Sequence, residues 1–201
     1  MQRICHGTSV LRTRCCQASY GILQDEKYKK GKHEEQIPFK CPFNGKYYVR
    51  DQIHWILYKD KTIKEGTPIR HKIKRRIGLE DSSKGWEDTV VISKIHTDCL
   101  PRYLGQGDSR QVCRLLSNLG PQDLGLLGVT IKRKSILGKK YLQVEYELLI
   151  YVEQESLRFE VRIIGKEKGE SKTVKAGWTF EDSRLAHGTV EDQLQNSLII
   201  A

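Results

Sequence analysis

The stretch KKYLQVEYELLIYVEQESLRFEVRIIGKE, residues 139–167, shows the pattern that decides the fold of this chain. From Leu142 to Val152 every second residue is apolar, and polar residues such as Glu145 and Glu147 stand between them. After the short turn EQES, the same alternation returns from Leu157 to Ile163. Because successive side chains of a β-strand point to opposite faces, this pattern predicts an antiparallel hairpin with one buried face and one face in water.

Shorter apolar stretches precede and follow the hairpin, and segments rich in Gly, Pro and charged residues separate them. One stretch, VRDQIHWILYKD, fits either a strand or a helical turn by its spacing, and its β-branched and aromatic residues favour a strand. No long amphipathic helix is evident. The chain is therefore predicted to be mainly β, an antiparallel β-sandwich of about eight strands. The other strands are expected in ASYGILQDE, PIRHKIKRR, DTVVISKIH, QVCRLLSNL and KTVKAGW.

The length of 201 residues suits one domain with short tails. We expect a linker-like segment at 1–16, the sandwich at 17–178 and a tail at 179–201, in which a short helix around 190–199 is one option. The sequence has no apolar run of about 18 residues and no apolar core of a secretory signal. The six cysteines are scattered, which argues against a disulfide framework or zinc site. A cytoplasmic protein without a metal is predicted.

Sequence motifs for catalysis are missing from the chain. It has no G-x-S-x-G, no phosphate-binding G-x-x-x-x-G-K-[ST], no H-E-x-x-H and no G-x-G-x-x-G. The G-x-G in YLGQGDSR lacks the third glycine and lies between predicted strands instead of opening a helix. We therefore expect a binding protein without a cofactor, and not an enzyme.

The net charge of +10 is unevenly distributed, and residues 61–76, KTIKEGTPIRHKIKRR, hold seven Lys or Arg residues and one Glu. Such a stripe favours nucleic acid or another polyanion, because binding releases counterions from the phosphates. The alternative is that the charged residues form the solvent-exposed face of a strand. Ile69, His71 and Ile73 occupy every second position, so they would share the opposite face. Stacking aromatic residues are not interleaved with the charges, which favours this alternative. The candidate polyanion-binding residues are Arg70, Lys72, Lys74, Arg75 and Arg76.

Five stretches occur in a defined order along the chain: LRTRCCQASYGI, KYYVRDQIHWILYKDKTIKEGTPI, WEDTVVISKIHTDCLPRYL, KKYLQVEYELLIYV and LRFEVRIIGKEKGE. Together they resemble the C-terminal β part of the heat shock protein 70 chaperones, in a divergent, fungal-type branch of that family. In that branch an Arg-rich segment leads into YG, a VRDQI-x-W block follows, and an L-x-FEV hairpin comes late. The resemblance extends from Val10 to Trp178.

The resemblance implies a β-sandwich domain that holds an extended peptide in a cleft between loops at one end of its sheets. It also implies that the ATPase domain and the helical lid of the family are not part of this sequence, so ATP hydrolysis is not carried over. The partners would be extended apolar peptides or unfolded protein segments. An ATPase domain or a co-chaperone would come from another chain.

By the same resemblance, two loops frame the cleft, EKYKKGKHEEQIPFKCPFNGKYY and IGLEDSSKGWE, and the strand TVVISKIHT forms its floor. Each apolar residue in these segments has the alternative role of packing against its own loop. The candidate peptide-binding residues are Phe39, Phe43, Ile77, Leu79, Trp86, Val91 and Ile95.

Three functional hypotheses follow from the sequence. The first is a peptide- or protein-binding module of the chaperone type. The second is a basic β-sandwich that binds nucleic acid or another polyanion. The third is a remnant of a larger protein with no independent activity.

Overall fold

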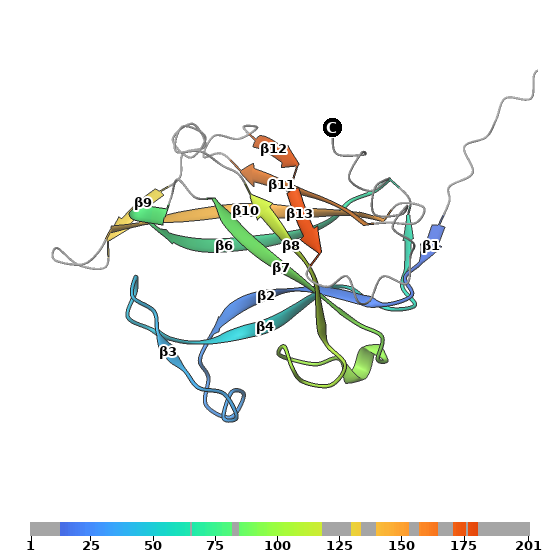
Figure 1. Ribbon diagram of the computed structural model, residues 1–201, viewed down its shortest axis with the longest axis horizontal. Coiled ribbons are helices and arrows are strands. Elements are labelled where there is room, and N and C mark those ends of the chain that lie inside the picture. The colour runs from blue at the N-terminus through green and yellow to red at the C-terminus, as the bar shows by residue number, and fades with distance from the viewer. Residues whose placement is uncertain are drawn as a thin grey trace, which may run out of the picture.

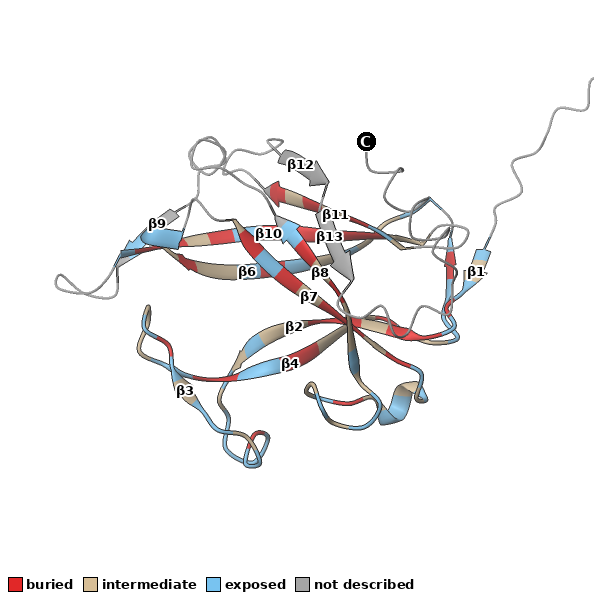
Figure 2. Ribbon diagram, viewed as in Figure 1, coloured by how far each residue is buried: buried red, intermediate tan, exposed pale blue. Residues whose placement is uncertain are grey.

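The computed structural model describes residues 13–64, 66–81, 85–117, 130–133, 140–152, 157–164, 171–175 and 177–180. In this part of the chain two large antiparallel sheets face one another (Figure 1). Buried residues occur in both sheets (Figure 2), and one core cluster combines apolar residues of the two. The predicted fold, a mainly β protein of the antiparallel β-sandwich type, is confirmed.

The first sheet contains β12 (Ser171–Lys175), β11 (Leu157–Ile164), β10 (Lys140–Val152) and β6 (Ile69–Gly78) in this order, with β9 (Thr130–Arg133) also paired to β10. The second contains β13 (Gly177–Phe180), β8 (Arg110–Ser117), β7 (Trp86–Ser93), β2 (Ser19–Lys27), β4 (Tyr47–Leu57) and β3 (Phe39–Lys40). A small third sheet pairs β1 (Thr13–Cys15) with β5 (Thr62–Lys64). Two short 3₁₀ turns, η1 (Leu79–Asp81) and η2 (Thr97–Cys99), precede and follow β7.

The predicted hairpin forms the centre of the first sheet. Strands β10 and β11 pair in register from Tyr146 opposite Ile163 to Val152 opposite Leu157. On its other side β10 pairs with β6 along the whole length of β6. Strand β6 is therefore the last strand of this sheet in the described part of the chain, and its second edge carries no partner strand there.

Some predicted boundaries differ from the structure. The stretch KTVKAGW, expected to be one strand, is divided between β12 and β13, which belong to different sheets. Residues 13–15 of the predicted linker form β1, and residues 179–180 of the predicted tail belong to β13. The helix considered near residues 190–199 lies outside the described residues. The ambiguous stretch around Trp55 is a strand, β4, as its composition indicated.

The central core lies between the two sheets and follows the alternation of the hairpin. Tyr146, Leu148 and Phe159 of the first sheet pack in the same cluster as Ile22, Leu57 and Leu115 of the second. These residues leave water almost completely on folding, and burial of each large apolar side chain contributes about 1.5–3 kcal/mol. Trp86 also belongs to this cluster, with its ring centroid 5.2 Å from that of Tyr146.

A loop pairs with the edge of β4 in the second sheet. Residues 94–109 lie along β4, where Ile53 N donates to Arg102 O at 2.8 Å and Leu104 N donates to Asp51 O at 3.0 Å. The indole nitrogen of Trp55 donates to Pro101 O at 2.8 Å. The loop therefore continues the second sheet beyond β4, because main-chain hydrogen bonds of this kind lie in the plane of a sheet.

Replacing either of two core aromatic residues should destabilise the fold. Phe159→Ala and Trp86→Ala should each lower the free energy of unfolding by roughly 3–5 kcal/mol, because each leaves a cavity between the sheets. Urea denaturation of the purified variants measures the change. Ile37→Ala is the control, because Ile37 is 92% exposed, and it should shift stability by less than about 0.5 kcal/mol. A loss below about 1 kcal/mol for Trp86→Ala would contradict its place in the core.

Candidate functional site

A cleft of about 360 Å³ opens between the sheets where β2 separates from β7. The two strands pair only from Ser19 opposite Ser93 to Ile22 opposite Val90. Beyond Ile22, β2 continues to Lys27 beside β4 alone, and the first residues of β7 continue beside β8. Figure 1 shows β2 and β4 bending away from β6 and β7 in this region.

Two strand edges form opposite walls of the cleft. Residues 23–25 of β2 line one side, and residues 73–76 of β6 line the other. Consecutive residues of a strand point to opposite faces, so a cavity that touches several in a row lies along the edge of the strand. The cleft therefore runs beside backbone that has no partner strand in the described part of the chain.

The long loop between β2 and β4 supplies the aromatic lining. Phe39 and Phe43 are half-buried at the cleft, with Cys41 and Pro42 between them. The ring of Phe43 lies 5.3 Å from that of Tyr141 in the opposite sheet. A Cβ atom at Gly78 would lie 3.9 Å from the Phe43 ring, which is an ordinary van der Waals distance, and 3.3 Å from Asp81 Oδ2, which is tight. The guanidinium of Arg50 lies over Phe39, at 4.8 Å from the ring centroid.

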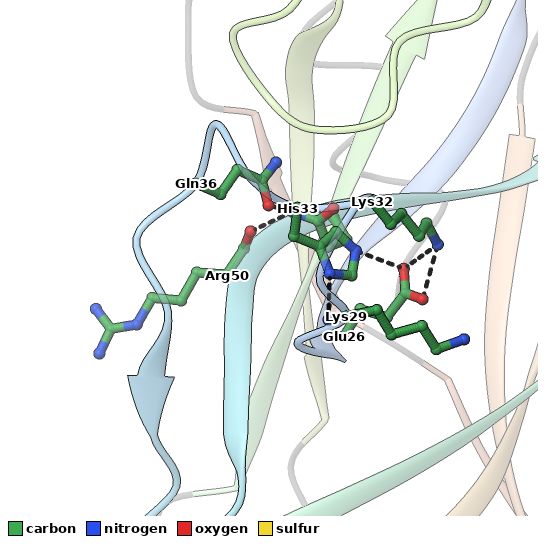
Figure 3. A network of polar contacts seen from close by, with 7 residues as sticks. Glu26, Lys29, Lys32, His33, Gln36 and Arg50 are labelled. Carbon is green, nitrogen blue, oxygen red and sulfur yellow. Dashed lines mark hydrogen bonds and ion pairs between the residues drawn. The ribbon is translucent and has the colours of Figure 1, made fainter.

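A polar network fixes the same loop (Figure 3). His33 is almost completely buried, and its Nδ1 accepts a hydrogen bond from Lys29 N at 3.0 Å. Its Nε2 faces Glu26 Oε2 at 3.6 Å, and Lys32 Nζ donates to both oxygens of Glu26 at 2.7 Å. Burial tends to raise the pKa of Glu26, but the hydrogen bonds and charge of Lys32 and the nearby His33 outweigh it and hold the pKa below its ordinary value. The loop is thus anchored on the end of β2.

A second anchor joins the loop to β4. Gln52 donates from its amide nitrogen to Gln36 Oε1 at 2.8 Å and to Arg50 O at 2.7 Å. Gln52 is buried, and these bonds satisfy its amide in a place where water does not reach it. The loop is therefore held at two points in its first half, His33 and Gln36, ahead of the aromatic lining.

Charged groups of both signs surround the cleft. Asp25 and Asp51 line it, and Asp51 adopts a left-handed conformation with φ 56° where β4 has one residue more than β2, between Gln52 and Val49. Burial raises the pKa of Asp25, and the charge of Asp51 adds to this effect, while Arg50, Arg75 and Arg76 oppose it. On the opposite wall, the guanidinium of Arg76 lies over Tyr48 at 5.4 Å. The cleft is therefore lined by acidic and basic side chains as well as by two aromatic rings.

Beneath the cleft, a buried ion pair connects the two sheets. Asp88 of β7 is 0% exposed, and Arg75 Nη2 of β6 donates to its Oδ1 at 2.6 Å. The hydroxyl of Tyr146 in β10 lies 2.8 and 2.6 Å from the two oxygens of Asp88. Burial, followed by the charge of Asp88, raises the pKa of Tyr146 well above its ordinary value, so its hydroxyl keeps its proton and donates.

The sequence contains a signal for this pair that its analysis missed. Asp88 shares the parity of Trp86 and Val90, and Arg75 shares the parity of Ile73 and Ile77. A charged residue between two apolar residues on the buried face of each strand indicates a pair across the core, because an isolated buried charge is very costly.

The structure separates the predicted peptide-binding residues into three groups. Only Phe39 and Phe43 line the cleft. Ile77 and Trp86 lie in the central core, so the expectation of Trp86 as an anchor in a loop is wrong. It is the first residue of β7 and is 7% exposed.

The remaining three candidates lie elsewhere. Val91 is completely buried, and because its neighbour Val90 points into the central core, Val91 points to the outer face of the second sheet. The prediction that this strand forms the cleft floor is therefore wrong for Val91. Ile95 lies in the loop of residues 94–109, where a Cβ atom at Gly107 would lie 3.4 Å from it. Leu79 is exposed on η1 and does not line the cleft.

The predicted basic stripe is divided by the register of β6 and β10. Arg75 points inward to Asp88, and Lys74 forms an ion pair with Glu145 on the outer face. Lys72 stands opposite Glu147, which in turn binds Arg162 at 2.6 Å. Arg76 lines the cleft. Arg70 and Lys72 are exposed and have no ion pair among the described residues. The outer face therefore alternates in charge and is not a continuous basic surface.

The buried pair should be far more important for stability than an exposed one. Asp88→Ala should lower the free energy of unfolding by roughly 3–5 kcal/mol, because it leaves Arg75 and the Tyr146 hydroxyl buried without their partner. Glu145→Ala, which removes the exposed pair with Lys74, should cost less than about 1 kcal/mol. Guanidinium denaturation of both variants gives the comparison, and equal losses would contradict a structural role for the buried pair.

Comparison with known proteins identifies a family but no activity. No helix among the described residues has the length and apolar character needed to cross a membrane. The same residues contain no group of three or more His, Cys, Asp or Glu side chains placed to hold a metal ion. No curated protein and no solved structure matches the chain. A family described as a domain of unknown function, DUF8568, matches residues 14–180, and the chain belongs to this family.

Proposed function

We propose that this protein is a non-catalytic module that binds extended peptides or unfolded protein segments in the cleft between its sheets. The observation that carries the proposal is the position of the cleft between two strand edges, residues 23–25 of β2 and residues 73–76 of β6. An extended peptide recognises such edges with its main-chain N–H and C=O groups, and its alternate side chains enter pockets. Because main-chain groups are the same in nearly every residue, such hydrogen bonding tolerates peptides of many different sequences.

The aromatic lining supports an apolar ligand. Phe39 and Phe43 are only half-buried, so each retains surface that a ligand side chain can cover. Aromatic side chains contribute strongly to binding when they line a pocket that excludes water. Charged groups that line the cleft, among them Asp25 and Arg76, could pair with charged side chains of a bound segment.

The sequence resemblance to the heat shock protein 70 chaperones also supports this function. The two loops that the resemblance places around a peptide cleft are residues 26–48 and 77–87. The observed cleft is lined by Phe39 and Phe43 of the first loop and by Arg76 and Glu87 at the borders of the second. An ATPase domain or a co-chaperone on another chain is part of this proposal.

We also place the protein in the cytoplasm. Five cysteines are described, and all of them are free. Burial raises the pKa of Cys113 to about 12, which keeps its thiol protonated and unreactive. Free thiols of this kind suit a reducing compartment.

The proposal predicts weak binding of an apolar peptide that depends on the cleft. Fluorescence anisotropy with a labelled, extended heptapeptide rich in Leu should give a dissociation constant on the order of 100 µM. Phe43→Ala should weaken binding by roughly tenfold, because it removes one aromatic wall. Tyr58→Ala is the matched control, since Tyr58 is an exposed aromatic residue just beyond the far end of β4.

Thermal melts of both variants show whether a loss of affinity reflects unfolding. If the intact protein binds no peptide up to about 1 mM, the hypothesis of a remnant without independent activity replaces this one. If both variants bind as well as the original protein, the ligand does not use this cleft.

Two of the candidate polyanion-binding residues, Arg70 and Lys72, are exposed and could still contact a polyanion. The carboxylates of Glu145 and Glu147 on the same face oppose this contact, because they repel phosphates. We therefore expect a labelled single-stranded oligonucleotide to bind weakly and to dissociate at about 0.15 M salt, as contacts driven by counterion release do. Submicromolar binding at that salt concentration, lost in an Arg70→Glu, Lys72→Glu double variant, would establish the polyanion function instead.

A further inference from the structure

Two histidines lie between the sheets beside the cleft. His54 is on β4 and His71 is on β6, both half-buried, and their ring centroids are 6.2 Å apart. They come from different sheets, so the pair spans the space between the layers. His71 is two residues from Ile73, which lines the cleft.

A polar contact joins His71 to the other wall of the cleft. Gln24 of β2 lines the cleft, and its Nε2 lies 3.4 Å from His71 Nε2. An amide nitrogen only donates, so in this contact the imidazole nitrogen accepts, and His71 is neutral with its proton on Nδ1. Among the described side chains this hydrogen bond links β2 to β6 directly, and these are the strands that form the two walls.

We propose that His54 and His71 form a pH-sensitive latch, which holds the two walls of the cleft together when both rings are neutral and releases them when the rings are protonated. A protonated His71 donates from both nitrogens and can no longer accept from the amide nitrogen of Gln24, so this contact breaks unless the amide rotates to present its oxygen. Two imidazolium rings at this distance also repel one another in a space that water reaches only in part. The latch regulates access to the proposed peptide site, and in that respect alone it depends on the proposed function.

The surroundings favour the neutral rings. Burial lowers the pKa of His54, Glu26 opposes this effect, and Lys32 adds to it. Burial also lowers the pKa of His71, the charge of His54 adds to the effect, and Asp88 opposes it. Arg75 already balances the charge of Asp88, and Tyr146 donates a hydrogen bond to it. Asp88 therefore has a limited effect in raising the pKa of His71. The titratable and charged groups around the pair are Glu26, Lys32, His33, Arg75, Asp88 and Tyr146.

These directions give the pH dependence a definite sign. A histidine whose pKa is lower in the closed state takes up a proton when the walls separate, so acid favours opening. The closed state keeps its full stability above the ordinary histidine pKa of about 6.5 and loses it progressively as the pH falls towards the lowered values. Within that window each histidine increases the opening equilibrium by up to about tenfold per pH unit.

Hydrogen exchange of the full chain tests the latch without any ligand. Mass spectrometry of segments covering β2 and β6 is carried out at pH 7.5 and 5.5, with correction for the intrinsic exchange rate. We expect exchange in these two strands to rise at least tenfold at the lower pH, while β8 changes little. Proton NMR titration of the imidazole Cε1–H signals in the same protein should show two histidines that titrate below the others.

Variants in which a histidine is replaced by a residue that does not titrate distinguish the latch from a general sensitivity of the fold to acid. His54→Gln and His71→Gln, singly and together, should reduce or abolish the rise in exchange, whereas His96→Gln should leave it unchanged, because His96 is exposed outside the cleft. If the double variant does not fold, the NMR titration and the two single variants still decide. The proposal is overturned if both histidines titrate as exposed ones do, or if the rise in exchange persists without them. Failure of peptide binding would leave this result unaffected.

Discussion

The buried carboxylate of Asp88 is the constraint on which the arrangement of the sheets depends. It has no access to water, its charge is balanced by Arg75, and it accepts a hydrogen bond from the hydroxyl of Tyr146, both from the opposite sheet. Apolar side chains such as Leu148 and Leu115 attract one another in many relative positions, because hydrophobic contact has no direction. A charged hydrogen bond has direction, and its loss at this depth costs several kcal/mol. The pair therefore selects one stacking of β6 and β10 on β7.

This stacking determines where the sandwich opens. Arg75 is drawn inward to Asp88, so the neighbouring residues Lys74 and Arg76 lie toward the outside and the edge of β6. On the other sheet, β7 stays with β8 while β2 follows β4, whose irregular register at Asp51 turns it away. The cleft is thus a consequence of two preferences, a buried ion pair that holds β7 against β6 and a bulge that bends β2 and β4.

The sequence pattern was sufficient for the fold class and insufficient for the site. Alternation shows which residues of a strand share a face, and it predicted the hairpin of β10 and β11 and the strand character of β4. It does not show which strands become neighbours, so the separation of β2 from β7 was not predictable from it. Phe39 and Phe43 line the observed cleft, and they were proposed as peptide-binding residues only because the family resemblance pointed to their loop. Trp86 was misplaced because Gly85 precedes it and suggests a loop, although its parity with Val90 indicates the core.

The anchoring of the long loop on β2 and β4 has a consequence for the thermodynamics of ligand capture. The contacts of His33 with Lys29 and of Gln52 with Gln36 exist without a ligand, so the rim that carries the aromatic rings is ordered before any encounter. Ordering a flexible loop on binding would cost about 1–2 kcal/mol of conformational entropy for each residue fixed. In this protein the loop is already ordered when the domain folds, so ligand binding does not have to order it. A ligand would find a preorganised surface, and its own loss of freedom would be the main entropic term in its affinity.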